Sequence, residues 1–174
     1  MQQEQEHIIF TIGHSTRTIE EFIAMLRSFD IQLLADIRRF PGSKKYPQFN
    51  SPSLAASLQQ AGIEYIHMPE LGGRRKPLAD SHNTAWKNPS FRGYADYMET
   101  DSFKEGVEKL EGLAANKRVA YMCSEAVSWR CHRSLVSDYL KIRDWKVMHI
   151  MDVDKATEHP YTSPAKEVQG KLFY

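Results

Sequence analysis

Residues 8–26 run IIFTIGHSTRTIEEFIAML and contain the unit that recurs along the whole chain. The short β-branched run 8–12 is typical of a buried strand, and it ends at Gly13-His14-Ser15. Thr18 then predicts a helix N-cap, because Glu21 three residues later completes a capping box. Apolar residues recur after it at helical spacing and give this helix one apolar face: Ile19, Phe22, Ile23 and Leu26.

The same alternation of strand and helix continues to the end of the chain. Further buried strands are predicted at residues 31–37, 63–68, 118–123 and 146–151. Helices are predicted from Ser51 as N-cap to Gly62, over 94–99, from Asp101 as N-cap through Ala114, and over 130–142. Residues 40–47 and 69–91 are predicted to be loops because Pro and Gly interrupt them. Residues 1–7 are expected to be a flexible N-terminus and 152–174 an extended tail draped over the body.

Strands that alternate with helices favour right-handed crossovers and a parallel sheet. The predicted fold is a single three-layer α/β domain over residues 1–174, with a mostly parallel sheet of about five strands and helices on both faces. A chain of 174 residues has the length of one domain and can bury its core without staples. Ligands of such sheets bind beyond the carboxyl ends of the strands. We therefore expect one edge of the sheet to collect the segments that start at Gly13, Asp36, Pro69, Cys123 and Asp152.

The composition excludes several classes of protein. With 41% hydrophobic and 26% charged residues, the chain is neither disordered nor fibrous. Its 23 Lys and Arg against 22 Asp and Glu leave no global basic excess that would indicate DNA binding. The sequence shows no signal peptide and no run long enough to span a membrane, and two cysteines are too few for a disulfide scaffold. We expect a cytoplasmic protein that makes no membrane contact.

Basic residues gather on the segments that follow the predicted strands. These segments hold ten of the 23 Lys and Arg: Arg17, Arg38, Arg39, Lys44, Lys45, Arg74, Arg75, Lys76, Arg130 and Arg133. They hold fewer acids, chiefly Asp36, Glu70, Asp80 and Glu125. A near-neutral protein with this distribution presents a positive rim, for which an anionic partner is the complement. The plain alternative is that loops are charged because they are solvated.

Residues 122–133, MCSEAVSWRCHR, join a predicted strand to a predicted helix. Arg130, His132 and Arg133 fall at the helix start, where free N–H groups and the helix dipole already favour negative charge. Cations placed there need an anion among them, either a phosphate or carboxylate of a ligand or the side chain of Glu125. We therefore expect an anion site, with neutralisation by Glu125 as the structural alternative.

Cys123 and Cys131 admit chemical roles. A helix start and nearby cations lower a thiol pKa, and His132 or His14 would serve as the partner base of a nucleophile. Six residues separate Cys123 from Arg130, one more than in the phosphatase loop. No zinc site is predicted, because the cysteines and His132 lack two close ligand pairs. A buried Cys123 that acts as a small hydrophobe is the plain alternative.

Earlier positions complete the candidate site. Gly13 permits close backbone approach, and His14 can transfer a proton. Asp36 inside a buried run needs a partner, for which Arg38 is suited, and both structural pairing and active-site duty fit it. Leu71-Gly72-Gly73 either brings backbone N–H groups to a ligand or forms a plain turn. No cofactor is predicted, because neither a G-x-G-x-x-G motif nor a P-loop is present.

These landmarks, in this order, resemble the family known as domain of unknown function 488. The residues that carry the resemblance are Thr11-Ile12-Gly13-His14-Ser15, Asp36-Ile37-Arg38 with Pro41 and Ser43, Leu71-Gly72-Gly73, Cys123-Ser124-Glu125, Cys131-His132-Arg133 and His159-Pro160-Tyr161. The resemblance spans nearly the whole chain. It implies one α/β domain with these motifs around a single site, and it supplies no reaction.

The sequence thus predicts an enzyme, a hydrolase or a transferase, that acts on a phosphate-bearing or nucleotide-like substrate, free or within nucleic acid. The candidate catalytic residues are Glu125, Cys123, His14 and Asp36. The candidate substrate-binding residues are Gly13, Ser15, Arg38, Ser43, Gly72, Gly73, Cys131, His132 and Arg133. Two alternatives stay open: a non-catalytic module that binds anions or nucleic acid, and a thiol-based sensor that uses Cys123 and Cys131.

Overall fold

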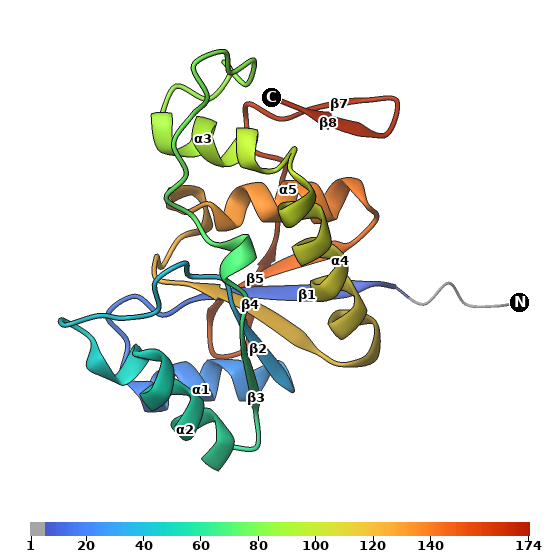
Figure 1. Ribbon diagram of the computed structural model, residues 1–174. Helices are drawn as coiled ribbons and strands as arrows, with labels where there is room; N and C mark the ends of the chain where they lie inside the picture. The colour runs from blue at the N-terminus through green and yellow to red at the C-terminus, as the bar shows by residue number, and fades with distance from the viewer. Residues whose placement is uncertain (1–5) are drawn as a thin grey trace, which may run out of the picture.

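Six strands form the central sheet, in the order β3-β2-β4-β1-β5-β6, in the computed structural model, which describes residues 6–174 (Figure 1). Their bounds are β1 Ile8–Gly13, β2 Leu33–Asp36, β3 Glu64–His67, β4 Val119–Cys123, β5 Lys146–Asp152 and β6 Lys155–Glu158. The first five strands run parallel to their neighbours, and β6 pairs antiparallel with β5. The prediction of a mostly parallel sheet is confirmed.

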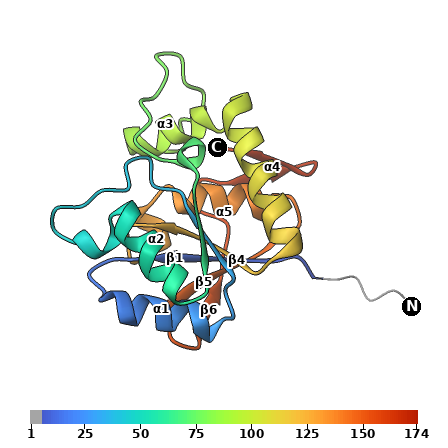
Figure 2. The ribbon, with the colours of Figure 1, turned by 60° about the horizontal axis from the view of Figure 1, so that its bottom comes forward.

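Helices cover both faces of this sheet (Figures 1 and 2). One face carries α1 Ile19–Ser28 and α2 Ser51–Gln60, and the other carries α3 Pro89–Tyr97, α4 Asp101–Asn116 and α5 Arg133–Ile142. Three short 3-10 helices lie in the connections: η1 Pro47–Phe49, η2 Pro69–Leu71 and η3 Ser128–Arg130. The predicted three-layer α/β architecture is therefore confirmed.

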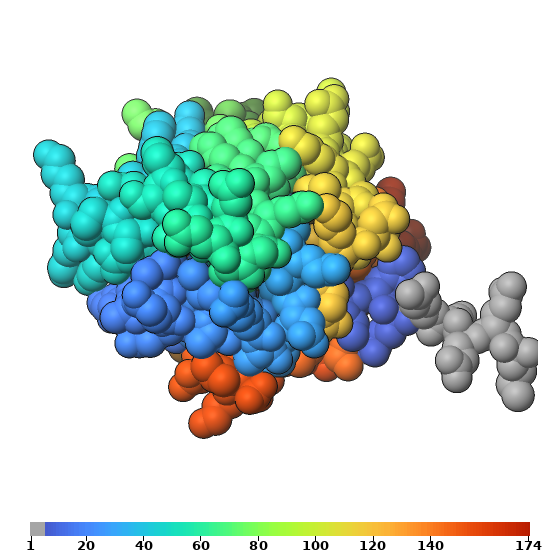
Figure 3. Space-filling view, turned by 90° about the horizontal axis from the view of Figure 1, so that it is seen from below, coloured from blue at the N-terminus to red at the C-terminus, as the bar shows by residue number. Residues whose placement is uncertain are grey.

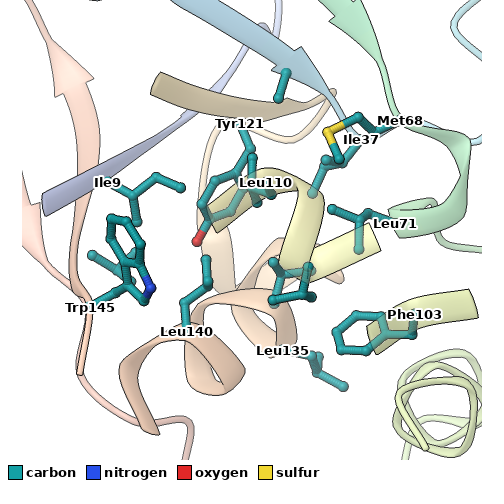
Figure 4. Close-up of a cluster of buried hydrophobic side chains, with 14 of the residues drawn as sticks. Ile9, Ile37, Met68, Leu71, Phe103, Leu110, Tyr121, Leu135, Leu140 and Trp145 are labelled. Atoms are coloured by element: carbon teal, nitrogen blue, oxygen red, sulfur yellow. The ribbon is translucent and has the colours of Figure 1, made fainter. Parts of the chain in front are cut away.

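Alternation along the strands divides the apolar side chains between two cores. Ile9 of β1 faces α3, α4 and α5, where it joins Tyr121, Leu140 and Trp145 in the larger core (Figure 4). Its neighbour Phe10 faces the opposite way, into the core beneath α1 and α2. Figure 3 shows that opposite face, where α1 and α2 lie side by side.

Helix starts differ by one residue from prediction at two places. Asn50 takes the N-cap position of α2, so Ser51 is its first helical residue. Thr100 likewise caps α4 in place of Asp101, and its side chain accepts a hydrogen bond from the amide of Phe103. In each case a second good capping residue stands directly before the predicted one. The predicted cap of α1 is confirmed, since Thr18 accepts from the amide of Glu21.

Two other helices were placed less well. α3 begins at Pro89 instead of residue 94, because the Asn88 side chain caps it and Pro89 is suited to the first helical position. α5 begins at Arg133 instead of residue 130, because residues 128–130 form the separate turn η3.

The C-terminal tail contains three regular strands, where an extended segment was predicted. Residues 155–158 add β6 to the sheet, and β7 Lys166–Val168 and β8 Lys171–Phe173 form a two-stranded hairpin. At the other end, residues 1–5 of the predicted flexible segment lie outside the described residues. His7 is held by its carbonyl, which accepts from the amide of Lys146 at 2.7 Å. Within residues 6–174, no helix is long and apolar enough to cross a membrane.

Candidate functional site

The carboxyl ends of neighbouring strands border one cavity of about 700 Å³. Its walls come from segments that are far apart in the sequence. Four segments follow strands: 14–16 after β1, residues between 38 and 46 after β2, 73–74 after β3, and 123–125 with 130–132 at and after the end of β4. The start of α3 adds Asn88, Ser90 and Phe91. The parallel sheet thus brings together most of the segments that we expected to meet. Among the described residues, the segment that starts at Asp152 contributes nothing to this lining.

The cavity wall carries an excess of positive charge. Arg38, Arg39, Lys45, Arg74 and Arg130 line it, against one carboxylate in the described lining, that of Glu125. Arg38 is neutralised by Asp36 at 2.8 Å. The other four cations have no carboxylate within 4 Å anywhere in residues 6–174. The wall therefore keeps four charges that no carboxylate of the described residues pairs.

Asp36 lies beneath this wall, fully buried. Arg38 donates to both of its oxygens, at 2.9 and 2.8 Å, and the Tyr65 hydroxyl donates to Oδ2 at 2.6 Å. Arg38 also donates to the carbonyl of Phe49 at 2.7 Å. The predicted partnership is present. Asp36 was predicted as a catalytic residue, but it is not among the cavity-lining residues, and its carboxylate holds Arg38 in position.

His14 presents a neutral imidazole to the cavity. Its ring stacks on Phe49, with centroids 4.4 Å apart and planes 15° apart. Nδ1 lies 2.9 Å from the Ser15 carbonyl, which can only accept, so Nδ1 carries the proton and Nε2 carries a lone pair. Burial lowers the pKa of His14 to about 4. At neutral pH, Nε2 is therefore a proton acceptor at the cavity wall.

The backbone after β1 is joined to the loop after β4. The amides of His14 and Ser15 donate to the carbonyls of Cys123 and Ser124, at 3.1 and 2.9 Å. A Cβ on Gly13 would stand 1.6 Å from the carbonyl oxygen of Glu125. The close approach predicted for Gly13 is thus made by the protein's own backbone, and Gly13 does not line the cavity.

The two glycines after η2 have different surroundings. A Cβ on Gly72 would stand 2.6 Å from Arg39 Cα, so this glycine makes room for the neighbouring loop and lies outside the lining. Gly73 does line the cavity, and a Cβ there would stand 2.8 Å from His132 Nδ1. Ser15 and Ser43 also lie in the lining, as predicted for residues that meet a ligand.

His132 and Arg133 turn in different directions at the start of α5. His132 lines the cavity and donates from Nε2 to the Ile37 carbonyl at 3.1 Å, while burial lowers its pKa. Arg133 is 1% exposed, and its guanidinium reaches only the carbonyls of Glu125 and Ala126, at 3.4 and 3.5 Å. Arg133 is predicted to bind substrate, but in the structure it is not among the residues that line the cavity, and its buried guanidinium lies against these loop carbonyls.

Cys123 and Cys131 both line the cavity, and the pKa values of their thiols are shifted in opposite directions. Burial raises the pKa of Cys123 well above its usual value. Burial also acts to raise the pKa of Cys131. The Cys123 side chain, the positive charge of Arg133 and the Arg133 amide outweigh this effect, so the pKa of Cys131 is lowered. Cys131 Sγ lies 3.4 Å from His132 Nδ1. In the part of the chain that the structure describes, no group of three or more His, Cys, Asp or Glu is placed to hold a metal ion.

The sequence reasoning missed the contribution of α3 to the site. Asn88 and Ser90 line the cavity because Asn88 caps the helix there. The pattern Asn88-Pro89 was a usable signal, since a capping residue followed by proline is typical of a helix start. The signal was missed because residues 69–91 were predicted to be one long loop.

A second buried polar cluster lies away from the cavity and was also missed. His149 and His159 form its centre: Asp138 accepts from His159 Nε2 at 2.8 Å, His159 Nδ1 lies 2.8 Å from His149 Nε2, and His149 Nδ1 lies 2.5 Å from Thr11 Oγ1. Asp138 also accepts from Tyr174 at 2.8 Å. We call this chain of contacts the Asp138 cluster. Its residues come from β1, α5, β5 and the tail, and none of them lines the cavity.

Comparison with protein families matches residues 18–140 to one family model, described as Domain of unknown function DUF488. The matched stretch covers most of the 174 residues and includes every cavity-lining segment except the one after β1. No curated protein and no solved structure matches the chain.

Proposed function

The chain belongs to the DUF488 family, and we propose that it is an enzyme that acts on a phosphate-bearing or nucleotide-like substrate in the cavity at the sheet edge. The observation that carries the proposal is the set of four cations, Arg39, Lys45, Arg74 and Arg130, without a carboxylate partner within residues 6–174. A cavity of about 700 Å³ has the size of sites that hold small molecules. Guanidinium groups suit phosphate because they donate two parallel hydrogen bonds.

Aromatic side chains at the cavity support a nucleotide-like substrate. Phe40 is 61% exposed, and the guanidinium groups of Arg39 and Arg74 lie 5.4 and 5.6 Å from its ring centroid. Tyr46 and Phe91 also belong to the lining. A ring flanked by cations offers a base a stacking face next to charges that suit its phosphate.

Two residues of the cavity lining have positive φ: Ser15 at 48° and Arg74 at 60°. Residues other than glycine rarely adopt this conformation, and it also occurs outside the lining, at Asp30, Asp144, Asp154 and Gln169.

His14 and Glu125 are the groups best placed for proton transfer. His14 Nε2 accepts a proton from an attacking water or hydroxyl, and Glu125 faces the same cavity. Cys123 is a weaker candidate nucleophile, since its raised pKa keeps it a thiol. Asp36 acts through Arg38 as a positioning residue.

Calorimetric titration with adenosine 5′-monophosphate and with inorganic pyrophosphate tests the binding step. We expect the Arg39→Ala/Arg74→Ala variant to bind roughly tenfold or more weakly, and Arg27→Ala, on α1 and outside the lining, to match the wild type. Equal affinity of the double variant and the wild type would disprove the proposal. For catalysis, phosphate release or strand cleavage is followed over a panel of nucleotides and oligonucleotides, and Glu125→Gln is expected to lose turnover but retain affinity.

The alternative is a module that binds nucleic acid without catalysis. The exposure of Trp129, 66%, next to the cavity-lining Arg130 favours an extended strand over a small molecule. A steep fall in oligonucleotide affinity with added salt, together with no turnover in any panel member, would support this alternative. In either case we propose a cytoplasmic location, where thiols such as Cys123 and Cys131 stay reduced.

A further inference from the structure

Two cysteines, Cys123 and Cys131, line the same cavity. Cys123 ends β4, and Cys131 lies directly before His132, the N-cap of α5. Both are free, both are buried and both line the cavity. The two sulfurs are joined through shared neighbours: Cys123 Sγ and the Arg133 guanidinium both contact the Glu125 carbonyl, at 3.8 and 3.4 Å, and the Arg133 amide donates to Cys131 Sγ at 3.4 Å. They are the two cysteines of the entire chain, so each has the other as its one intramolecular thiol partner.

The surroundings of Cys131 favour a thiolate. The backbone amide of Arg133 donates to its sulfur at 3.4 Å. The buried Arg133 guanidinium has an Nε without a hydrogen-bond partner, and no carboxylate of residues 6–174 lies within 4 Å of it. His132 donates from Nε2, so its Nδ1, 3.4 Å from the Cys131 sulfur, is free to take the Cys131 proton, and the ionised sulfur then supplies the opposite charge that the buried guanidinium needs.

The surroundings of Cys123 favour a thiol. Its sulfur contacts the Glu125 carbonyl at 3.8 Å, where it acts as the donor. Its side chain is 1% exposed and belongs to the same cavity lining as Cys131. The pair therefore combines one sulfur suited to attack and one proton-bearing sulfur in the same cavity lining.

We propose that Cys123 and Cys131 form a dithiol site that a hydroperoxide oxidises to a disulfide. The Cys131 thiolate attacks the terminal oxygen of the hydroperoxide, the O–O bond breaks, and the alkoxide or hydroxide that leaves takes a proton from solvent. The product is a sulfenic acid at Cys131. The Cys123 sulfur then attacks the Cys131 sulfur, the S–O bond breaks, and hydroxide leaves with the Cys123 proton as water. In total, two thiols are oxidised to one disulfide. The hydroperoxide is reduced to an alcohol and one water, and hydrogen peroxide is reduced to two waters. An external dithiol reverses the change.

This chemistry is separate from the proposed phosphate chemistry. It requires access for a molecule little larger than water, which the cavity provides, and it requires no phosphate-bearing substrate. Closing the disulfide removes the negative charge that faces Arg133, so the site couples the electrostatics of the cavity wall to the redox state.

Thiol trapping on the full chain tests the proposal. The protein is exposed to hydrogen peroxide, the remaining thiols are alkylated, and the intact mass and peptide map are measured. We expect both thiols to disappear together, one peptide pair linked through Cys123 and Cys131, and complete recovery with dithiothreitol. Oxidation of either sulfur to a sulfinic acid without a cross-link, or two fully alkylatable thiols after treatment, would overturn the proposal.

Two single variants separate the roles of the sulfurs. In Cys123→Ser, a sulfenic acid that dimedone traps should accumulate at Cys131. In Cys131→Ser, Cys123 should react with peroxide roughly tenfold or more slowly than Cys131 does in the first variant. Equal rates in the two variants would contradict the assignment of Cys131 as the attacking sulfur, and the far-ultraviolet circular dichroism of each variant checks that both are folded.

Discussion

The Asp138 cluster and the cavity wall differ in how their charged side chains are paired. In the cluster, the Asp138 carboxylate accepts from His159, Tyr174 and Thr162, at 2.8, 2.8 and 2.5 Å. At the cavity wall, Arg39, Lys45, Arg74 and Arg130 have no carboxylate within 4 Å in residues 6–174. A buried charge that is fully paired holds elements together, whereas unpaired charges around a hollow leave interactions for a ligand to complete. The comparison predicts that substitutions in the cluster reduce stability and that substitutions at the wall reduce binding.

The largest expected effect is on the Asp138 cluster. Asp138→Ala leaves the buried His159 and the Tyr174 hydroxyl without their acceptor, so we expect the free energy of unfolding to fall by about 3–5 kcal/mol. Arg74→Ala is the matched change at the wall and should alter it by less than about 0.5 kcal/mol. Urea unfolding followed by circular dichroism measures both. Similar losses in the two variants would remove the distinction between the regions.

The next effect tests how rigid the cavity is. Gly13→Ala places a Cβ where the Glu125 carbonyl oxygen stands, so the loop after β4 must move, at a cost of about 2–3 kcal/mol. Gly112→Ala in α4 is the control, because nothing lies within 4 Å of its new Cβ, and it should stabilise the protein by about 0.5–1 kcal/mol. Thermal unfolding of both variants gives the comparison. If Gly13→Ala unfolds at the same temperature as the wild type, the loop after β4 moves at little energetic cost, which would contradict the prediction.

The smallest effect concerns pH and His14. Burial lowers its pKa from 6.5 to about 4 in the folded state, so between these values the unfolded state binds more protons. Stability through His14 is therefore fully present above pH 6.5 and is lost as the pH falls toward 4, with a loss of about 2 kcal/mol already at pH 5. In His14→Gln, the difference in unfolding free energy between pH 7 and pH 5 should shrink by that amount. An unchanged pH profile would show that His14 is not held neutral.

The fold was predictable because its signals are local. Strands such as 8–12 and caps such as Thr18 are marked by neighbouring residues, and parallel strands place their carboxyl ends together. β6 was not predictable, because Lys155–Glu158 has no apolar pattern and is defined by its pairing with β5.

The candidate site was predictable in part, for a related reason. The rule for parallel sheets placed His14, Glu125 and His132 around one hollow, where the structure has them. It could not show that Arg133 lies outside the cavity lining, because that depends on where α5 starts. The Asp138 cluster joins residues as far apart in sequence as Thr11 and His149, so no spacing pattern could reveal it.

The contact between Gly13 and the Glu125 carbonyl also limits how this protein can diverge. A side chain at position 13 and the present path of residues 124–126 exclude each other, since a Cβ would stand 1.6 Å from that oxygen. Relatives that replace the glycine should therefore carry a loop of altered length or course after β4. The two segments are expected to co-vary during evolution, as one inherited unit.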